Sequence, residues 1–170
     1  MTDPDHGNPI LAELFRHNLW ANLTLIDLCL TLSEEILATN VPGTFGGIHE
    51  TLTHLAGAEE RYLLALAGGA KQPNPALEEI APDLATVREH ARQSGERFVA
   101  YAATVEGNPT LDVTWHGQSY KMPTAFYLVQ AINHSTEHRS QVKIALTQAG
   151  ISPPELDGWT WDDERRVQAQ

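Results

Sequence analysis

The sequence predicts an all-α protein, a four-helix bundle with a short β-hairpin before the last helix. Four stretches carry apolar residues three and four positions apart, the spacing of a buried helix face. Connections that contain Pro or Gly separate these stretches, and a segment of alternating apolar residues precedes the fourth. The 170-residue chain shows no repeat or linker that would divide it, so we expect a single domain over residues 1–170.

The first two helices are expected over residues 10–38 and 48–67. The buried positions of the first are Leu14, Asn18, Ala21, Leu25, Leu28 and Leu32, and those of the second are Ile48, Leu52, Leu55, Tyr62 and Leu66. One proline and three glycines in residues 39–47 favour a break between them, and Gly68-Gly69 is a typical helix stop.

The third helix is expected to have Pro82 and Asp83 in its first turn and to end near Gly107. Residues 111–122 then favour a hairpin that turns at residues 116–118. The fourth helix should run from residue 123 or 124 to Ala149, with Gly150 as its cap. The four helices can form an up-and-down bundle or a close variant with a crossing connection. We expect the tail to begin ordered and then to fray, with Trp159 and Trp161 as candidates to cover a pocket.

Charge and composition exclude several classes of partner. The chain has 11 Lys+Arg against 22 Asp+Glu, a formal net charge of -11, which disfavours nucleic acid and anionic membranes. It contains no apolar run near the roughly 20 residues that cross a bilayer, and no export signal, so we expect a cytoplasmic protein. The single cysteine, Cys29, cannot form an intramolecular disulfide and is expected to fill the core.

The segment HSTEH holds the most informative pattern. His134 and His138 are four residues apart, so they project from one face of the fourth helix and can chelate one ion. That face is the apolar one, which also allows the alternative that both are ordinary core histidines with satisfied nitrogens. His54 lies beside the buried face of the second helix, where small neighbours leave space next to its ring: Thr51, Ala58 and Ala65. Three histidines on two facing helices suit a metal site inside a bundle.

Longer motifs give a resemblance to a known family. They are HNLWANLTLIDL in the first helix, FGGIHETLTHLAGAEERYL in the second, and NHSTEHRSQVKIAL in the fourth. With the Trp-Ala-Asn of residues 20–22, the His-Leu of 54–55 and the His-x-x-x-His-Arg-x-Gln of 134–141 in this order, the chain resembles the DinB and YfiT-like family over nearly its whole length.

The resemblance implies a bundle, often dimeric, with one zinc or nickel ion on His54, His134 and His138. It also implies S-transfer or isomerisation of a small-molecule substrate with a low-molecular-weight thiol of the bacillithiol, mycothiol or glutathione type. One hypothesis is therefore a metal-dependent S-transferase or hydrolase that activates a thiol or water. The alternative is a non-catalytic, stress-related dimer that binds a metal or a small ligand. Neither hypothesis assigns a catalytic residue.

Three amides are candidates for the surroundings of the site. Asn18 and Asn22 lie one turn apart on the inner face of the first helix, and Gln141 follows His138 by three residues. They either line the pocket or hydrogen-bond only to specify packing.

Other metal motifs do not fit the sequence. Glu137 is in the wrong place for HExxH and is expected at the surface, and no Glu is followed three residues later by His as in di-iron bundles. His49 points more than about 100° away from His54 around the helix, so it is expected to lie outside the site. His6, His17, His90 and His116 are interpreted as ordinary histidines. Phe126, Val129 and Ile144 lie outside the histidine face, and either a homodimer contact or packing of the hairpin or the tail would explain them.

Overall fold

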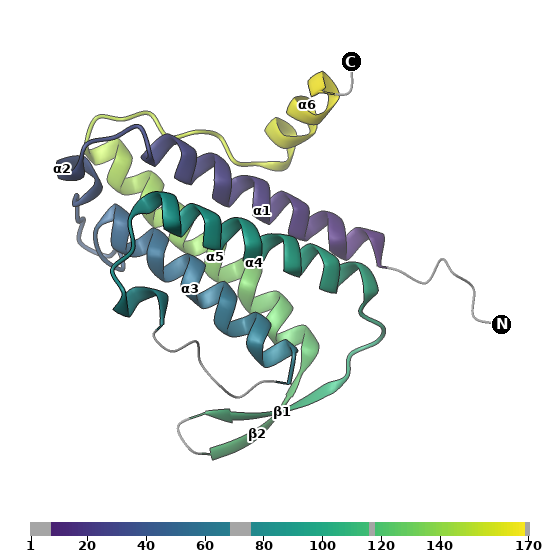
Figure 1. Ribbon diagram of the computed structural model, residues 1–170. Helices are drawn as coiled ribbons and strands as arrows, with labels where there is room; N and C mark the ends of the chain where they lie inside the picture. The colour runs from purple at the N-terminus through teal and green to yellow at the C-terminus, as the bar shows by residue number, and fades with distance from the viewer. Residues whose placement is uncertain (1–7, 69–75, 116–117, 169–170) are drawn as a thin grey trace.

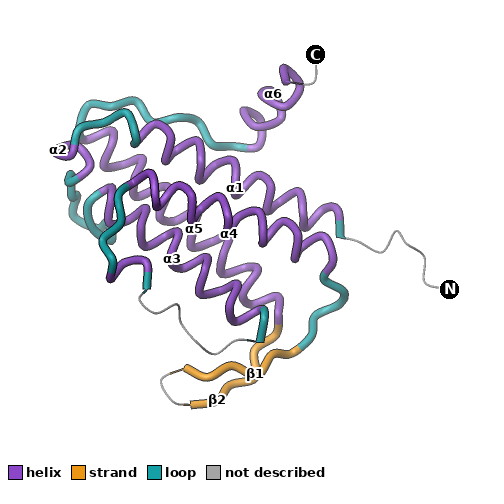
Figure 2. Tube along the Cα trace, in the orientation of Figure 1, coloured by secondary structure: helices purple, strands orange, loops and turns teal. Residues whose placement is uncertain are grey.

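The computed structural model describes residues 8–68, 76–115 and 118–168, and it confirms the predicted fold class (Figures 1 and 2). The described residues form six α-helices, one short 3-10 helix and a two-stranded hairpin. In chain order these are α1 (Pro9–Cys29), α2 (Glu34–Leu37), α3 (Ile48–Leu66), η1 (Leu77–Glu79), α4 (Leu84–Thr104), β1 (Thr110–Trp115), β2 (Gln118–Pro123), α5 (Thr124–Gln148) and α6 (Gly158–Gln168).

The four long helices, α1, α3, α4 and α5, make the bundle, with α2 at one end and the hairpin at the other (Figure 1). α4 packs on α1 and α3, and α5 packs on α3. The N-terminal halves of α3 and α4 share one core cluster, which contains Leu52 and Val87, and their C-terminal halves share another, which contains Leu63 and Phe98. These two helices are therefore parallel, and the bundle is the variant with a crossing connection.

The first helix is shorter than the sequence predicted. α1 ends at Cys29 instead of Ala38, and α2 begins after Ser33. The Ser33 hydroxyl accepts a hydrogen bond from the backbone N–H of Ile36, so Ser33 caps a new helix instead of continuing the old one. Asp83 similarly caps α4 by accepting from the N–H of Thr86 at 2.7 Å, so it lies just before the first turn in which it was predicted.

The hairpin and the last bundle helix agree with the predicted positions. β1 and β2 pair antiparallel from Thr110 opposite Pro123 to Trp115 opposite Gln118, and the predicted turn residues His116 and Gly117 lie outside the described residues. Gly150, with a φ of 78°, follows α5, as a glycine just beyond a helix commonly does.

The core has two apolar clusters with a polar layer between them. The cluster nearer to α2 contains Leu25, Ile26, Cys29, Ile48, Leu52, Ala56, Leu77, Leu84, Val87, Ala91, Val142, Ala145 and Leu146. The cluster nearer to the hairpin contains Phe15, Leu63, Leu66, Phe98, Ala102, Tyr127, Leu128 and Ala131. Between them lie buried polar residues of four helices, which we call the polar belt: Asn18, Asn22, Glu59, Ser94, Ser135 and Arg139.

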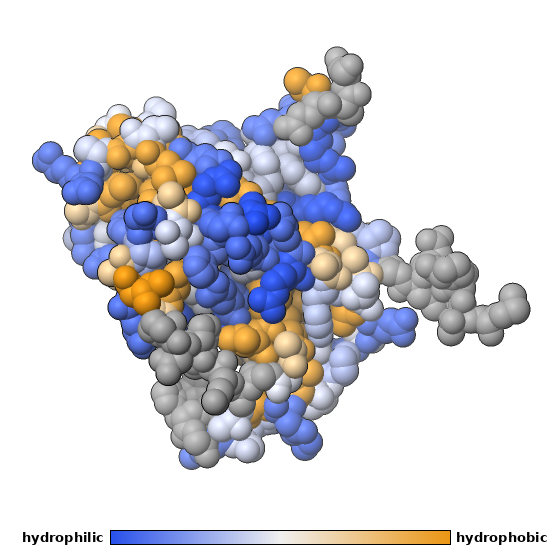
Figure 3. All heavy atoms as spheres, in the orientation of Figure 1, coloured by the Kyte–Doolittle hydropathy of each residue, from blue (hydrophilic) through white to orange (hydrophobic). Residues whose placement is uncertain are grey.

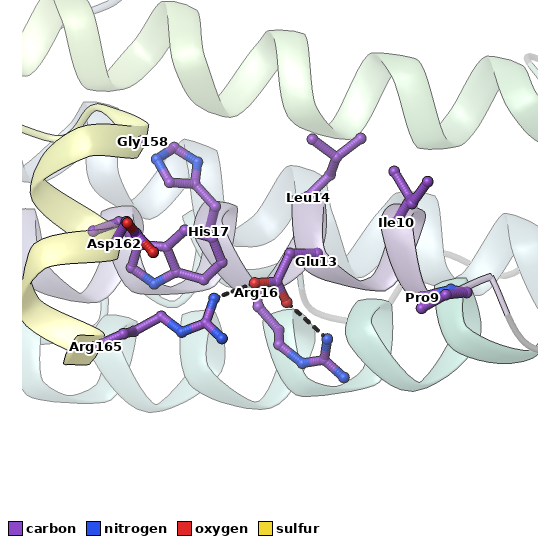
Figure 4. A pocket seen from close by; sticks show the side chains of 10 residues that line it. Pro9, Ile10, Glu13, Leu14, Arg16, His17, Gly158, Asp162 and Arg165 are labelled. Atoms are coloured by element: carbon purple, nitrogen blue, oxygen red, sulfur yellow. Dashed lines mark hydrogen bonds and ion pairs between the residues drawn. The ribbon is translucent and has the colours of Figure 1, made fainter. Parts of the chain in front are cut away.

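The C-terminal segment was predicted to fray, whereas through Gln168 it forms α6, which contacts α1. In Figure 1, α6 stands at the top, above the four-helix bundle. The Trp161 ring contacts those of His17 and Trp20, with centroids 5.4 and 6.5 Å apart. A groove of about 680 Å³ runs between α1 and α6, and Figure 4 shows Glu13 in it between Arg16 and Arg165. α6 therefore contacts α1 without closing the groove, in which Ile10 and Leu14 of α1 stay exposed, and Trp159 is 82% exposed.

Hydrophilic side chains gather over the centre of the face shown in Figure 3, where α4 lies. On this helix Arg92 pairs with Glu89 and with Glu96, each at 2.6 Å. Ion pairs three and four residues apart, such as these, stabilise a helix through its solvent-exposed face. Among the described residues, no helix is long and apolar enough to cross a membrane.

Candidate metal centre

Two neighbouring helices bring three histidines to one point. α3 and α5 run antiparallel, so His54 in the middle of α3 faces His134 and His138 in the middle of α5. The Nε2 atom of His134 lies 3.2 Å from Nε2 of His54 and 3.1 Å from Nε2 of His138. The same ring nitrogen of all three residues therefore points to a common centre.

The hydrogen bonds of Gln141 fix the orientation of the His138 ring. The Oε1 atom of Gln141 accepts a hydrogen bond from the backbone N–H of Phe45 at 3.0 Å and lies 2.9 Å from Nδ1 of His138. A backbone N–H can only donate, so the atom that faces it is the amide oxygen, and Nδ1 of His138 must carry the proton. The Nε2 atom of His138 then presents a lone pair to the centre.

A carboxylate has the same effect on His54. Oε1 of Glu78 lies 3.3 Å from Nδ1 of His54 and 2.7 Å from Nη1 of Arg61. With the proton on Nδ1, the Nε2 atom of His54 also presents a lone pair. The Phe45 ring stacks on His54, with centroids 4.0 Å apart and planes 14° apart, and holds it from the other side.

Burial keeps two of the rings neutral. The pKa of His134 falls to about 4 because desolvation and the neighbouring histidines disfavour its charged form. Desolvation, His138 and Arg61 likewise lower the pKa of His54, although Glu78 opposes them. Neutral imidazole is the form that ligates a metal.

The chemistry of this donor set fits a divalent metal ion. Lone pairs that face one another repel, and a single proton on Nε2 of His134 cannot satisfy both of its neighbours. An ion between the three Nε2 atoms would satisfy all of them. Within the described residues, this is the one group of three or more His, Cys, Asp or Glu side chains close enough to hold an ion. Fold and site together define a helical bundle with a three-histidine cluster that could hold a metal.

Comparison with known proteins gives the family. The chain matches the DinB family over residues 1–167. It is 22% identical over 153 residues to Protein DinB of Bacillus subtilis (strain 168), an alignment that covers 85% of this chain and 89% of that protein. The chain belongs to the DinB family.

Asn18 and Asn22 lie in the polar belt and do not contact the three histidines. Both donate from Nδ2 to Oε1 of Glu59 at 2.9 Å, and both accept from Nη1 of Arg139, at 2.7 and 2.6 Å. Of the three predicted amides, only Gln141 contacts a histidine of the cluster.

The belt is centred on a buried acid and a buried base. Glu59 also accepts from the hydroxyls of Ser94 and Ser135, at 2.8 and 3.0 Å. Burial raises the pKa of Glu59, while these hydrogen bonds and Arg139 oppose the rise. Burial lowers the pKa of Arg139 to about 10 against the effect of Glu59. Because Ser135 and Arg139 each directly follow a histidine of the cluster, the belt anchors the ligand-bearing part of α5.

Sequence reasoning missed several of these residues, among them Phe45, Glu59, Glu78 and Arg139. Glu59 and Arg139 occupy positions at helical spacing from buried apolar residues, so periodicity contained a signal for both. Phe45 and Glu78 lie in irregular or 3-10 segments, where periodicity says nothing about direction.

The other histidines and Glu137 lie outside the cluster. Glu137 is exposed, as predicted, and His49 is not part of the group of three. His90 pairs with Glu60, and His17 lies near the carbonyl oxygen of Leu156 at 3.0 Å. His6 and His116 lie outside the described residues.

Proposed function

We propose that His54, His134 and His138 bind one divalent metal ion through their Nε2 atoms, with zinc or nickel as the best candidates. The convergence of these three atoms, with two lone pairs directed by Gln141 and Glu78, carries the proposal. Imidazole suits both metals. The His54 side chain is 21% exposed, so the centre can be reached from solvent.

We propose further that the loaded protein is a metal-dependent S-transferase or hydrolase that acts on a small molecule. A bound ion on three neutral ligands would acidify a low-molecular-weight thiol of the bacillithiol, mycothiol or glutathione type, or a water molecule, at an open position. The chain itself contributes ring orientation through Gln141 and Glu78. Phe45, which is 54% exposed beside His54, supplies an apolar surface for a bound molecule.

Metal content tests the first step. The purified protein should carry one ion per chain by elemental analysis, and His54→Ala, His134→Ala and His138→Ala should each lose most of it. His49→Ala is the matched control, because this histidine is on α3 but outside the cluster. Full metal content in all three ligand variants would refute the proposed site.

Turnover tests the second step. Metal-loaded protein is offered each of the three thiols with a standard electrophile, and S-transfer is followed with and without a chelator. Hydrolysis of activated esters and amides is tested in parallel. The enzymatic proposal predicts a rate that falls with metal removal and in His134→Ala; a rate that does not depend on metal contradicts it.

The second candidate is a non-catalytic, stress-related metal- or ligand-binding homodimer. Exposed apolar side chains on α5 favour it: Phe126, Val129 and Ile144 are 44%, 59% and 51% exposed. Light scattering after size-exclusion chromatography should give twice the chain mass, and Val129→Glu should give a monomer. A monomeric wild-type protein at all working concentrations would exclude this dimer.

A further inference from the structure

Glu78 reaches the site from outside the bundle helices. It belongs to η1, in the connection between α3 and α4, and its carboxylate lies on the surface of α3. Arg61 holds both carboxylate oxygens from one guanidinium nitrogen, at 2.7 and 3.0 Å. One of these oxygens, Oε1, is also the atom that faces Nδ1 of His54 at 3.3 Å.

Three residues of α3 lie next to this carboxylate. His54, Gly57 and Arg61 are spaced by three and four residues, so they lie along one face of the helix. A Cβ atom on Gly57 would lie 2.7 Å from Oε2 and 2.9 Å from the carboxyl carbon of Glu78. The absence of a side chain at Gly57 is therefore what admits the carboxylate between the imidazole and the guanidinium.

We propose that Glu78 is a positioning residue of the metal centre. Glu78 accepts a hydrogen bond from the Nδ1–H group of His54 and so selects one tautomer of the ring. The Nε2 lone pair of His54 then faces His134 and His138. Arg61 fixes the carboxylate in turn, because one of its guanidinium nitrogens donates to both carboxylate oxygens. The inference rests on the proposed metal binding by His54.

An ion pair that served only to join η1 to α3 would not account for this arrangement. Glu78 and Arg61 alone would join the two segments, and their side chains are 30% and 23% exposed, a setting in which ion pairs contribute little to stability. An ion pair that only joined the two segments would not also place Oε1 of Glu78 at Nδ1 of His54. This second contact is the one that bears on the metal centre.

Zinc affinity of the full-length protein, measured by competition with a chromophoric chelator, tests the proposal. Loss of such an outer hydrogen-bond partner typically costs about 10–100-fold in metal affinity, and we expect Glu78→Ala to fall in this range. Glu78→Gln should lose less, because its amide oxygen still accepts from Nδ1. Glu79→Ala is the matched control, an exposed carboxylate on the same turn, and should bind as the wild type does.

Gly57→Ala separates positioning from stability. Alanine is the better helix former, so this variant keeps the fold while its methyl group displaces the Glu78 carboxylate. We expect its zinc affinity to fall in the same direction as that of Glu78→Ala. Nitrogen-15 NMR of the zinc-free protein gives a second readout: His54 should be the Nδ1–H tautomer in the wild type and a mixture in both variants.

The outcomes distinguish this inference from the proposed function. If the wild-type protein binds no zinc, the proposed function fails and the inference fails with it. If the wild type binds zinc while Glu78→Ala and Gly57→Ala bind within twofold of it and keep the wild-type tautomer, the metal site stands and the role of Glu78 is refuted. A lower affinity with a mixed tautomer in both variants supports the inference.

Discussion

Replacing Glu59 with alanine should destabilise the protein by about 3–5 kcal/mol, because it removes the acceptor at the centre of the polar belt. Glu59 is fully buried, and Arg139, its opposite charge, is only 6% exposed. The substitution leaves this guanidinium without a counter-charge inside the bundle. It also removes the shared acceptor of Asn18, Asn22, Ser94 and Ser135, of which Ser94 keeps the carbonyl oxygen of Ala91 as a second acceptor.

The size of the effect follows from these contacts. The orphaned donors, at about 1–3 kcal/mol each, would together exceed the loss expected for removing one member of a buried charged network, but members of one network do not add. Arg139 is joined to Glu59 through Asn18 and Asn22, so the figure for a buried charged network is the better measure. At about 2–4 °C per kcal/mol for a domain of this size, the melting temperature should fall by about 10 °C. Glu59→Gln keeps an acceptor oxygen and should lose roughly half as much free energy.

Urea unfolding followed by far-UV circular dichroism measures the change in the free energy of unfolding. Glu137→Ala is the control, because this exposed carboxylate is on α5 close to the belt in sequence and should change stability by less than about 0.5 kcal/mol. A loss below about 1 kcal/mol in Glu59→Ala would mean that the belt does not hold the helices together, and would refute this reasoning.

Three further predictions concern the core and α6. Burial raises the pKa of Cys29 to about 12, so at pH 8 a thiol reagent should label it only as fast as the chain unfolds, and rapid labelling of native protein would contradict its burial. Slight burial raises the pKa of Glu13, but Arg16 and Arg165 lower it overall. Its contribution to holding α6 is therefore present above the unfolded pKa near 4.5 and is lost as the pH falls through the folded pKa. Tryptophan fluorescence should report that loss, and Glu13→Gln should not show it. Trp161→Ala should loosen α6 yet leave zinc affinity unchanged, because Trp161 contacts α1 and none of the three histidines; a tenfold drop would place α6 at the site.

Much of the fold could be predicted from periodicity and helix-end residues. The long helices α3, α4 and α5 were expected to within a few residues, because their buried faces are regular and Gly or Pro stands at their ends. The break after Cys29 was missed because Leu30 and Leu32 continue the apolar pattern. The signal was Ser33 before two glutamates, which is typical of a helix start.

Helix direction and the tail required information that local sequence does not hold. Parallel α3 and α4 need a connection that returns along the bundle, and residues 67–83 are long enough for this, yet length alone permits either topology. α6 has a helix start at Asp157, whose side chain accepts from the N–H of Thr160 at 2.9 Å. Its docking depends on the outer face of α1, a tertiary contact that no local pattern shows.

At the candidate site, residue spacing predicted the shared face of His134 and His138, and the family resemblance supplied His54. That these three rings meet depends on how α5 lies against α3, 80 residues away in sequence. Asn18 and Asn22 were correctly placed on an inner face, but an amide there can serve a ligand or a buried acid. The choice between them rested on Glu59, whose burial is indicated by helical spacing but whose contact with Asn18 and Asn22 of another helix is not.

The polar belt also bears on whether the three histidines come together before a metal ion binds or because of it. Sliding α5 by one turn, about 5.4 Å, would press Arg139 against aliphatic side chains. The Oδ1 atoms of Asn18 and Asn22 would then lose the hydrogen bonds that Arg139 donates to them. The register that satisfies Glu59 is the one in which His54 faces the two histidines of α5. The ligands are thus arranged by the folding of the chain itself, with two apolar clusters to drive it. A small zinc module unfolds when its metal is removed, whereas this protein should stay folded whether or not the proposed site holds an ion, and should rebind an ion after treatment with a chelator.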